Sequence, residues 1–429
     1  ESADMASMKD IQREAVEPLC RALTECRMCK SKNLEEYLDL GQTPPADQFR
    51  TPEERDVPEI WYPLRVAVCT DCGLSQLTHV VDARVLYQFD YPYESSTTKT
   101  GKLHWDEFAQ AVVARLGLAK ESLVVDIGSN VGTLLESFRD TGMNVAGIDP
   151  APNIVEIANA NGVPTICDFY GAESAGATKE SHGPASAIVG TNVFAHIDDL
   201  DAVFTANEEL LADDGVFIFE SPYFGNLVKH LEYDTIYHEH LSYLSLAPVA
   251  KFAERYGREV FAVEETDIHG GSFRVYIGKK GQRPVDESVT RMLATEEETG
   301  LNRLENLKEF AGRVSENRRQ LMALISKLVA EGKKIAIVST PAKGMTLLNY
   351  CGITTQHATF ATEKARLKIG RVTPGGRIPI VPDEVLLTEA PDYALLLAWN
   401  FAKEIMANNQ AFTDAGGKFI IPIPEPRIA

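Results

Sequence analysis

The spacing of hydrophobic residues changes along the chain and divides it into three parts. Between about residues 84 and 247, short apolar runs alternate with segments whose apolar residues recur every three to four positions. This alternation of strand and helix predicts a parallel α/β sheet. The expected strands are, in order, "SLVVDI", "NVAGIDP", "VPTICDFY", "ASAIVGTNVFAHI" and "GVFIFESPY".

The flanking parts have different patterns. Residues 1–83 contain two short strand patterns, "NLEEYLDLGQ" and "GLSQLTHVVD", separated by Pro-rich sequence. Residues 248–429 begin with a helix and a β-rich stretch, followed by a helical run over 283–331. The strand–turn–helix pattern then returns in "KKIAIVSTPAKGMTLLNYCG", with further buried strands in "DYALLLAWN" and "KFIIPI". We therefore expect three domains, 1–83, 84–247 and 248–429, the last a smaller Rossmann-like unit.

Composition narrows the class of protein. The chain has 429 residues and a formal net charge of −20, which argues against a nucleic-acid-binding protein. No apolar run approaches the roughly 20 residues that a membrane helix needs, and the N-terminus lacks the apolar segment of a signal peptide. We expect a cytoplasmic protein with no membrane partner, a monomer or dimer. An anionic substrate would need a local basic pocket.

Four of the seven cysteines form two CxxC pairs, Cys26–Cys29 and Cys69–Cys72. Tetrahedral zinc favours four thiolates delivered as two such pairs. Because sulfur fills all four positions, no site is left open for a substrate. The metal should be structural and remote from catalysis.

A glycine-rich turn follows the first strand of the middle domain. In "VVDIGSNVG", Gly128 and Gly132 flank Ser129 and Asn130, and glycine allows the backbone to approach a ligand closely. Asp149 ends the second strand, where a carboxylate can accept ribose hydroxyls. Both NAD and S-adenosylmethionine (SAM) fit a carboxylate there, but NAD needs G-x-G-x-x-G. The frame D-x-G-x-(G/N)-x-G resembles motif I of class I SAM methyltransferases, with Asp168 and Asn192 after the third and fourth strands as further cofactor contacts.

The stretch "EYDTIYHEHLSY", residues 232–243, gathers imidazole, carboxylate and phenol groups. It is not the zinc-protease motif His-Glu-x-x-His, because its histidines are two positions apart and would face different sides of a helix. The fifth strand ends just before it, so the cluster should lie near the carboxyl edge of the sheet, where ligands of α/β proteins bind.

Taken together, these blocks resemble the deoxysugar C-methyltransferases over nearly the whole chain. The matching segments are "CRMCKSKNLEEYLDLGQTPPADQF", "DIGSNVGTLLE", "YHEHLSY", "HGGSFRVY" and "PAKGMTLLNYCGI". The resemblance implies SAM-dependent methylation of a ring carbon, typically C3, of a nucleoside-diphosphate keto-deoxysugar for branched-sugar biosynthesis. The substrate would be a TDP-, GDP- or CDP-linked sugar held by the C-terminal domain.

The implied chemistry gives the polar cluster a role. A sugar C–H becomes nucleophilic only when a proton next to a ketone is removed and the enolate is stabilised. His240 is the expected base because imidazole titrates near neutral pH. Tyr237 is the expected donor to the enolate oxygen, and Glu239 orients His240 or contacts a sugar hydroxyl. Tyr91 or Tyr93 of "DYPYESS" would lie over the pocket, with Tyr91 preferred.

The expected substrate contacts come from the C-terminal part. His269 and its neighbouring glycines would shape the sugar pocket, and Arg274 would pair either with the diphosphate or with a surface carboxylate. Lys343, at the start of a helix after a buried strand, would receive phosphate, with Arg377 as a further contact. The chain departs from the family pattern here: Ser339-Thr340 replace Gly-Ala, Glu363 and Ala365 replace Asp and Asn, and Gly376-Arg377 replace Thr-His.

Two other functions fit parts of the sequence. A SAM-dependent methyltransferase acting on oxygen or nitrogen would need no strong carbon base, so a His240→Asn variant would stay active. A zinc-ribbon protein that uses the α/β domain as a SAM sensor would bind the cofactor without turning over a keto sugar.

Overall fold

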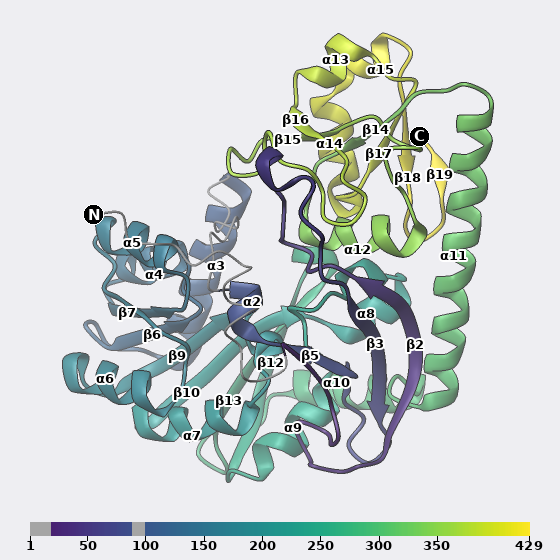
Figure 1. Cartoon of the computed structure of the whole chain (residues 1–429). Helices are drawn as coiled ribbons and strands as arrows, with labels where there is room; N and C mark the ends of the chain where they lie inside the picture. Colours follow the sequence, from purple (N-terminus) through teal and green to yellow (C-terminus); the bar gives the residue numbers. More distant parts are fainter. Residues whose placement is uncertain (1–18, 88–98) are drawn as a thin grey trace.

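The computed structural model describes residues 19–87 and 99–429. It contains two α/β lobes with an N-terminal β module between them (Figure 1). In that figure the purple strands of the module lie between the teal sheet on the left and the long helix α11 (Leu304–Ala330) on the right.

The N-terminal module is built from short antiparallel strands. Its four-stranded sheet has the order β11-β4-β3-β2, and β1 pairs with β5 in a separate ribbon. The strands are β1 (Cys20–Ala22), β2 (Leu34–Thr43), β3 (Tyr62–Cys69), β4 (Ser75–Leu77), β5 (His79–Val81) and β11 (Ser242–Tyr243). The helical segments are η1 (Pro52–Glu54) and α2 (Ala83–Tyr87). Because β11 comes from beyond residue 240, the module and the predicted catalytic segment share one sheet.

The middle lobe is a seven-stranded sheet of order β12-β13-β10-β9-β6-β7-β8. The strands are β6 (Leu123–Ile127), β7 (Asn144–Asp149), β8 (Thr165–Cys167), β9 (Ala185–Thr191), β10 (Leu211–Pro222), β12 (Arg258–Thr266) and β13 (Ser272–Lys279). The strand order reverses between β6 and β9, so the loops after them open a crevice at the carboxyl edge. All five predicted strands are present, and the predicted α/β class is confirmed.

Helices cover both faces of this sheet. They are α3 (Lys99–Leu116), α4 (Thr133–Asp140), α5 (Pro152–Ala160), α6 (Ala172–His182), α7 (Leu200–Leu210), α8 (Phe224–Lys229) and α9 (Leu246–Glu254), with the short turns η2 (Phe194–His196), η3 (Tyr233–Thr235) and η4 (Ile268–Gly270). Every residue of β6 is buried, which explains its unbroken apolar pattern. The antiparallel pair β12–β13 follows residue 247 but belongs to this sheet. The boundary at residue 247 stays a prediction, and a division after β13 would keep the sheet whole.

The C-terminal lobe is a second doubly wound unit. Its sheet has the order β16-β15-β14-β17-β18-β19. The strands are β14 (Ile335–Val338), β15 (Ala361–Glu363), β16 (Ile380–Pro382), β17 (Tyr393–Leu396), β18 (Lys418–Ile421) and β19 (Arg427–Ile428). The helices are α11, α12 (Ala342–Cys351), α13 (Val385–Glu389), η5 (Trp399–Phe401), α14 (Ala402–Asn408) and α15 (Gln410–Asp414). Helix α10 (Glu287–Thr299) instead packs against β12 and α9 of the middle lobe.

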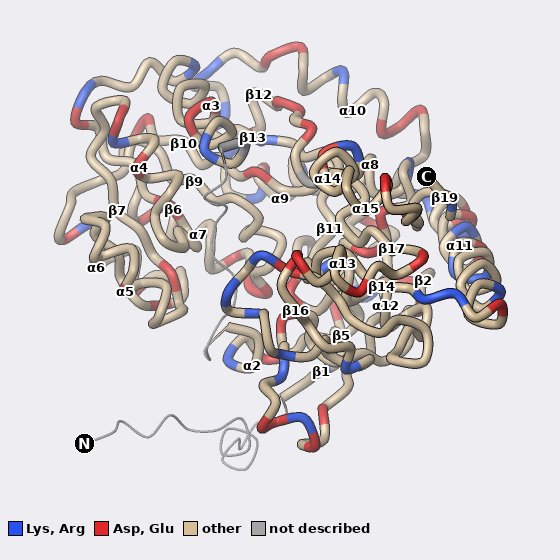
Figure 2. Tube along the Cα trace, turned by 90° about the horizontal axis from the view of Figure 1, so that it is seen from above, with Lys and Arg blue, Asp and Glu red and all other residues tan. Residues whose placement is uncertain are grey.

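Helix α11 shows how the apolar pattern fixes the packing. Its buried residues recur every three to four positions, which places them on one face: Leu307, Phe310, Val314, Asn317, Leu321, Ile325 and Leu328. Acidic and basic residues also occur along α11 (Figure 2).

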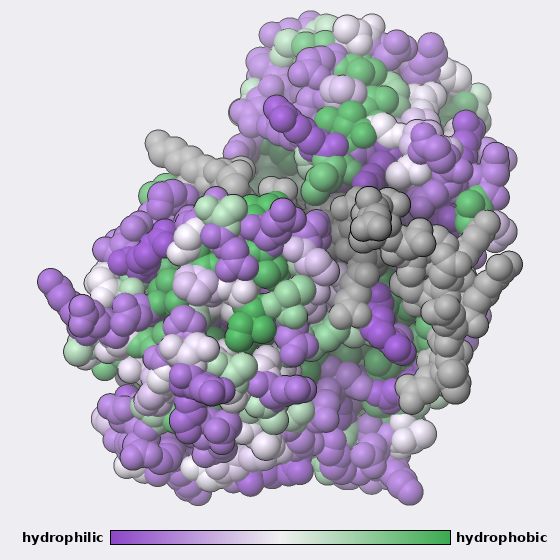
Figure 3. Space-filling model, turned by 60° about the vertical axis from the view of Figure 1, so that its left-hand side comes forward, coloured by the Kyte–Doolittle hydropathy of each residue, from purple (hydrophilic) through white to green (hydrophobic). Residues whose placement is uncertain are grey.

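Acidic and basic residues are interspersed along the chain (Figure 2). On the face shown in Figure 3, hydrophilic side chains cover most of the surface, and hydrophobic ones gather on the two lobes near the line where they meet. Within residues 19–87 and 99–429, none of the helices combines the length and apolar character needed to cross a bilayer.

Candidate active site

The glycine-rich turn after β6 adopts a backbone that requires glycine. Gly128 and Gly132 have φ of +65° and +88°, and Asn130 between them has φ of +52°. A Cβ at Gly128 would lie 2.8 Å from Val193, and one at Gly132 would lie 2.8 Å from Val163. The turn is therefore closed to larger side chains, and its backbone lies at the carboxyl edge of the sheet.

Asp149 at the end of β7 holds this turn in place. Its Oδ2 accepts a hydrogen bond from the Asn130 amide at 2.9 Å, and its Oδ1 accepts one from the Ala151 amide at 2.9 Å. Burial raises the pKa of Asp149, while these two amides oppose the rise. Burial and the charge of Asp149 raise the pKa of neighbouring Asp126 well above its usual value.

Other polar atoms of the same edge have no protein partner. The Ser129 hydroxyl and the Asn192 Oδ1 are buried and form no hydrogen bond with any described residue. Buried polar atoms normally have partners, so their position beside the turn fits a site for a polar cofactor such as SAM. Asp168 is exposed on the adjacent strand end, where its carboxylate accepts from the amide of Phe169 at 2.8 Å.

The predicted base belongs to the segment that follows β10 and α8. The Nδ1 of His240 lies 2.6 Å from the carbonyl oxygen of Thr235, so this nitrogen carries the proton. In the neutral ring, Nε2 then holds the lone pair that can accept a proton. The phenol ring of Tyr237 packs against the imidazole with 3.9 Å between ring centroids, so the structure brings the predicted base and donor together.

A second histidine completes this cluster. The ring of His196, in the turn after β9, stacks on His240 with 4.7 Å between centroids. Burial and the proximity of His240 hold the pKa of His196 well below its usual value. Both histidines line one small pocket with these residues: Asn192, Ala195, Ser221, Pro222, Phe224, Leu227, Thr235, Ser242 and Tyr243. The sequence signal for His196 was its position just after the fourth strand, where a surface or capping role fitted equally well.

Glu239 and Tyr87 lie beside the histidines. Glu239 is 3% exposed, and its main-chain oxygen accepts a hydrogen bond from the Tyr87 hydroxyl at 3.4 Å. The Tyr87 ring also stacks on His196, at 6.4 Å between centroids. Tyr91 and Tyr93 lie outside the described residues. His238 points away from the cluster, because its Nε2 donates to the carbonyl oxygen of Pro63 in β3 at 3.1 Å.

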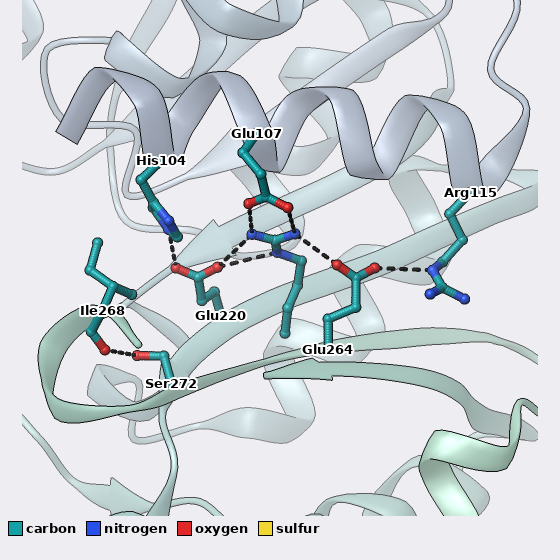
Figure 4. Close-up of polar contacts among 8 residues, drawn as sticks. His104, Glu107, Arg115, Glu220, Glu264, Ile268 and Ser272 are labelled. Atoms are coloured by element: carbon teal, nitrogen blue, oxygen red, sulfur yellow. Dashed lines mark hydrogen bonds and ion pairs between the residues drawn. The ribbon is translucent and has the colours of Figure 1, made fainter. Parts of the chain in front are cut away.

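Arg274 is enclosed by three carboxylates. They belong to Glu107, Glu220 and Glu264, which are labelled in Figure 4. Its side chain is 0% exposed and contacts Glu220 at 3.1 Å, Glu107 at 3.1 Å and Glu264 at 2.9 Å. His104 lies 2.7 Å from the other oxygen of Glu220. Of the two predicted alternatives, the structure shows pairing with carboxylates, which attaches α3 to β10 and β13.

Lys343 is also surrounded by protein groups. Its Nζ donates to Asn400 at 2.7 Å and lies 4.5 Å from the ring centroid of Trp399. Burial lowers the pKa of Lys343, whereas the nearby carboxylates of Asp234 and Glu232 raise it. These acidic neighbours make Lys343 a weaker candidate for a phosphate ligand than its position at the start of α12 indicated.

The remaining predicted substrate contacts lie apart from one another. Arg377 binds Glu59 at 3.2 Å and the carbonyl of Val57 at 3.2 Å, so it joins the C-terminal lobe to the N-terminal module. His269 belongs to η4, and its side chain lies outside the described atoms. The roles of all these residues stay predictions.

The four predicted zinc ligands meet at one point. The sulfur atoms of Cys26, Cys29, Cys69 and Cys72 all lie within 4.8 Å of one another. The separations are 3.6 Å for Cys26–Cys72 and 3.5 Å for Cys29–Cys69. A tetrahedral site with Zn–S bonds of about 2.3 Å needs sulfurs about 3.8 Å apart, so the four thiolates fit zinc.

Comparison with known proteins agrees with this geometry. Family models match residues 26–87, described as "Putative zinc binding domain", residues 103–263, described as a methyltransferase domain, and residues 267–424, described as a C-methyltransferase C-terminal domain. A curated protein, the C-methyltransferase NovU of Streptomyces niveus, is 39% identical over 414 residues, which cover 96% of this chain and 98% of NovU.

Solved structures are less similar. Magnesium protoporphyrin IX methyltransferase of Synechocystis PCC 6803 with bound SAM is 15% identical, with a TM-score of 0.32, over 44% of this chain and 87% of that one. The PH0226 protein of Pyrococcus horikoshii OT3 is 14% identical, with a TM-score of 0.35, over 44% of this chain and 97% of that one.

Proposed function

The chain belongs to the family of SAM-dependent C-methyltransferases with a zinc-binding domain, and from this premise we propose that it methylates a nucleotide-linked keto-deoxysugar. The methyl group goes to a ring carbon next to the ketone, C3 for a 4-keto sugar. The observation that carries the proposal is the orientation of His240, whose Nδ1 proton is held by Thr235 so that Nε2 serves as a base.

The reaction begins with removal of the proton from the carbon next to the ketone. Nε2 of His240 accepts this proton, and the electron pair of the C–H bond moves toward the carbonyl oxygen to form an enolate. Tyr237, in contact with the His240 ring, donates a hydrogen bond to that oxygen. SAM, when bound, would supply an electrophilic methyl group to the enolate carbon and would leave as S-adenosylhomocysteine.

Stacking on His196 assists the base. When His240 accepts the proton it becomes a positively charged imidazolium in an enclosed site. A second positive charge on the adjacent His196 would be costly there. Because the pKa of His196 is held well below its usual value, His196 stays neutral beside the charged His240. We assign His196 the role of a neutral partner that lines the pocket rather than that of a second base.

An arrangement in the C-terminal lobe supports nucleotide binding there. Glu363, at the end of β15, accepts hydrogen bonds from the amide of Thr340 at 3.1 Å and from the amide of Ala365 at 3.2 Å. Asp149 makes the corresponding pair of contacts in the middle lobe. It accepts from the amide of Asn130, in the turn after β6, and from the amide of Ala151, two residues after Asp149 itself. The two lobes therefore present the same carboxyl-edge geometry, and we assign the second to the nucleotide of the substrate.

Two of the departures from the family pattern at this edge, Thr340 and Glu363, compensate each other. The hydroxyl of Thr340 donates to Glu363 at 2.6 Å. Glu363 is one methylene longer than the aspartate of the family pattern, and Thr340 adds a hydroxyl where the pattern has alanine. Because these two side chains bind each other, the carboxylate still holds the turn after β14.

The test is a panel of TDP-, GDP- and CDP-linked 4-keto-deoxysugars incubated with the protein and SAM. Mass spectrometry should find one sugar that gains a single methyl group, and ¹³C NMR with labelled SAM should place the label on carbon. A label on oxygen or nitrogen would replace the proposal with another methyltransfer. SAM binding without any methylated product across the panel would support a sensor instead.

A further inference from the structure

We infer that Arg27, between the first two zinc ligands, is a positioning residue that fixes the relative placement of His196 and His240. The inference extends the proposed function, on which it rests only in treating His240 as the base and His196 as its neutral stacking partner. Arg27 is 3% exposed, although arginine is rarely buried without a full set of partners. Its partners lie on the two loops that carry the histidines.

The first loop follows His196. The Nη2 of Arg27 lies 3.1 Å from the carboxylate of Asp198, and its Nε donates to the main-chain oxygen of the same residue at 3.3 Å. The guanidinium therefore binds both the side chain and the backbone two positions after His196. A contact to the backbone restrains the path of the loop as well as one side chain.

The second loop contains His240. The Nη1 of Arg27 donates to the main-chain oxygen of Leu241 at 3.0 Å. The amide of Leu241 in turn donates to the main-chain oxygen of Ala195 at 2.8 Å, which joins the two loops directly. Arg27 thus contacts the residue after His240 and the residue two positions after His196.

Arg27 is also linked through Gln76 to the zinc ligand Cys26. Its main-chain amide donates to the side-chain oxygen of Gln76 at 3.0 Å, and the side-chain nitrogen of Gln76 donates to the sulfur of Cys26 at 3.3 Å. Gln76 pairs with Ser242 across strands β4 and β11. The contacts run from a zinc ligand through Gln76 and Arg27 to the loop bearing His240.

Arginine suits this position because its planar group offers five donors in a fixed fork. A lysine has a single ammonium nitrogen, which can bind Asp198 but cannot bind Asp198 and the main-chain oxygen of Leu241 at once, as Nε and Nη1 of Arg27 do. The prediction of a metal remote from catalysis did not anticipate this link. The zinc-binding turn stabilises the module and also sets the geometry of the histidine pair.

The test compares full-length, zinc-loaded Arg27→Met with Arg21→Met. Arg21 binds the same Asp198 carboxylate, but its side chain is 50% exposed, so its removal should change little. Metal analysis and calorimetry with SAM first establish that both variants keep zinc and cofactor affinity. The ring signals of His196 and His240 are then compared by NMR in protein labelled with ¹³C-histidine, where stacked rings shift each other's resonances.

We expect the two histidine signals to move in Arg27→Met and to stay in place in Arg21→Met. Turnover should fall by up to about 10²-fold in Arg27→Met, the loss typical of a misplacement near 1 Å. Arg27→Lys should recover part of both effects. Unmoved signals and full turnover in zinc-loaded Arg27→Met would overturn the inference.

Two further results of the Arg27→Met experiment have their own interpretation. If Arg27→Met does not fold, Asp198→Asn serves instead, since it weakens the same contact from a partly exposed side chain; unmoved signals there would also overturn the inference. If the signals move but turnover does not follow, the positioning role of Arg27 in the reaction is refuted. The identity of the base is tested independently by proton exchange in His240→Asn.

Discussion

The imidazole rings of His196 and His240 stack with their centroids 4.7 Å apart and their planes inclined by 30°. The two residues come from different loops, one after β9 and one after β10, which are neighbouring parallel strands. Their contact therefore follows from the strand order of the sheet. It places two imidazoles at the carboxyl edge beside the glycine turn, and only one of them, His240, has its Nδ1 proton fixed by a main-chain oxygen.

The first prediction concerns Arg274. Arg274→Met should lower the free energy of unfolding by about 3–5 kcal/mol, because it leaves the buried carboxylate of Glu220 without its cation. Chemical denaturation measures this change. Arg115→Met is the control: Arg115 binds Glu264 at 3.0 Å from a partly exposed position, so its loss should cost less than about 1 kcal/mol. A stable Arg274→Met protein with a raised KM for the sugar would instead support diphosphate binding.

The second prediction is a pH dependence of stability. Burial lowers the pKa of His238 to about 4, from 6.5 in the unfolded chain. Between these values the unfolded chain binds a proton that the folded chain does not, so stability is complete above pH 6.5 and falls toward pH 4. The contribution of this histidine is about 3 kcal/mol.

His238→Gln should flatten that dependence, because glutamine keeps a donor for Pro63 and does not titrate. Unfolding in urea at several pH values between 4 and 7 measures the slope. His182→Gln, at an exposed position, is the control and should leave the slope unchanged. An equal slope in His238→Gln and the parent chain would show that another group is responsible.

The third prediction concerns the cofactor edge. Asp149→Ala should weaken SAM binding by about 1–3 kcal/mol, the cost of losing a charge-assisted hydrogen bond. The two amides that Asp149 holds would also be released, so Asp149→Asn should fall between the parent and the alanine variant. The SAM affinity of Asp168→Ala gives a comparison, because Asp168 is an exposed carboxylate just after β8, at the same edge of the sheet. Calorimetry showing unchanged affinity in Asp149→Ala would mean that SAM does not use this carboxylate.

The fourth prediction concerns a strained residue of the C-terminal lobe. Ser339 has φ of +65°, a conformation that costs an ordinary L-residue roughly 1–2 kcal/mol. Its buried hydroxyl forms no hydrogen bond with a described residue. Ser339→Gly should therefore raise the free energy of unfolding by up to about 1 kcal/mol, after the entropic cost of glycine. Ser339→Ala keeps the strain and should give no gain; a gain of equal size in Ser339→Ala would show that the hydroxyl, not the backbone, is unfavourable.

Local sequence patterns were sufficient for the strands of the middle domain and for the zinc ligands. The unbroken apolar run of β6, the glycines at positive φ and the paired cysteines each depend on neighbours along the chain. The proximity of Tyr237 and His240 was also predicted, since both lie in one short segment. The left-handed backbone at Ser339 has a sequence signal too, because the family pattern has glycine there.

Contacts between distant segments were not accessible in this way. Arg274 lies in an apolar strand pattern that gives no indication of three carboxylates arriving from α3, β10 and β12. Arg27 likewise lies between two cysteines, and only the pairing of β4 with β11 brings it to Leu241. Such contacts depend on how whole elements pack, which a periodic pattern does not encode.

The central claim is that His240 removes the proton next to the ketone. It is tested most directly by exchange of that proton with deuterated water, with S-adenosylhomocysteine in place of SAM so that methyl transfer cannot occur. His240→Asn should slow the exchange by about 10²–10⁴-fold while binding the cofactor normally. Exchange at the parent rate in His240→Asn would contradict the account and assign the base to another residue.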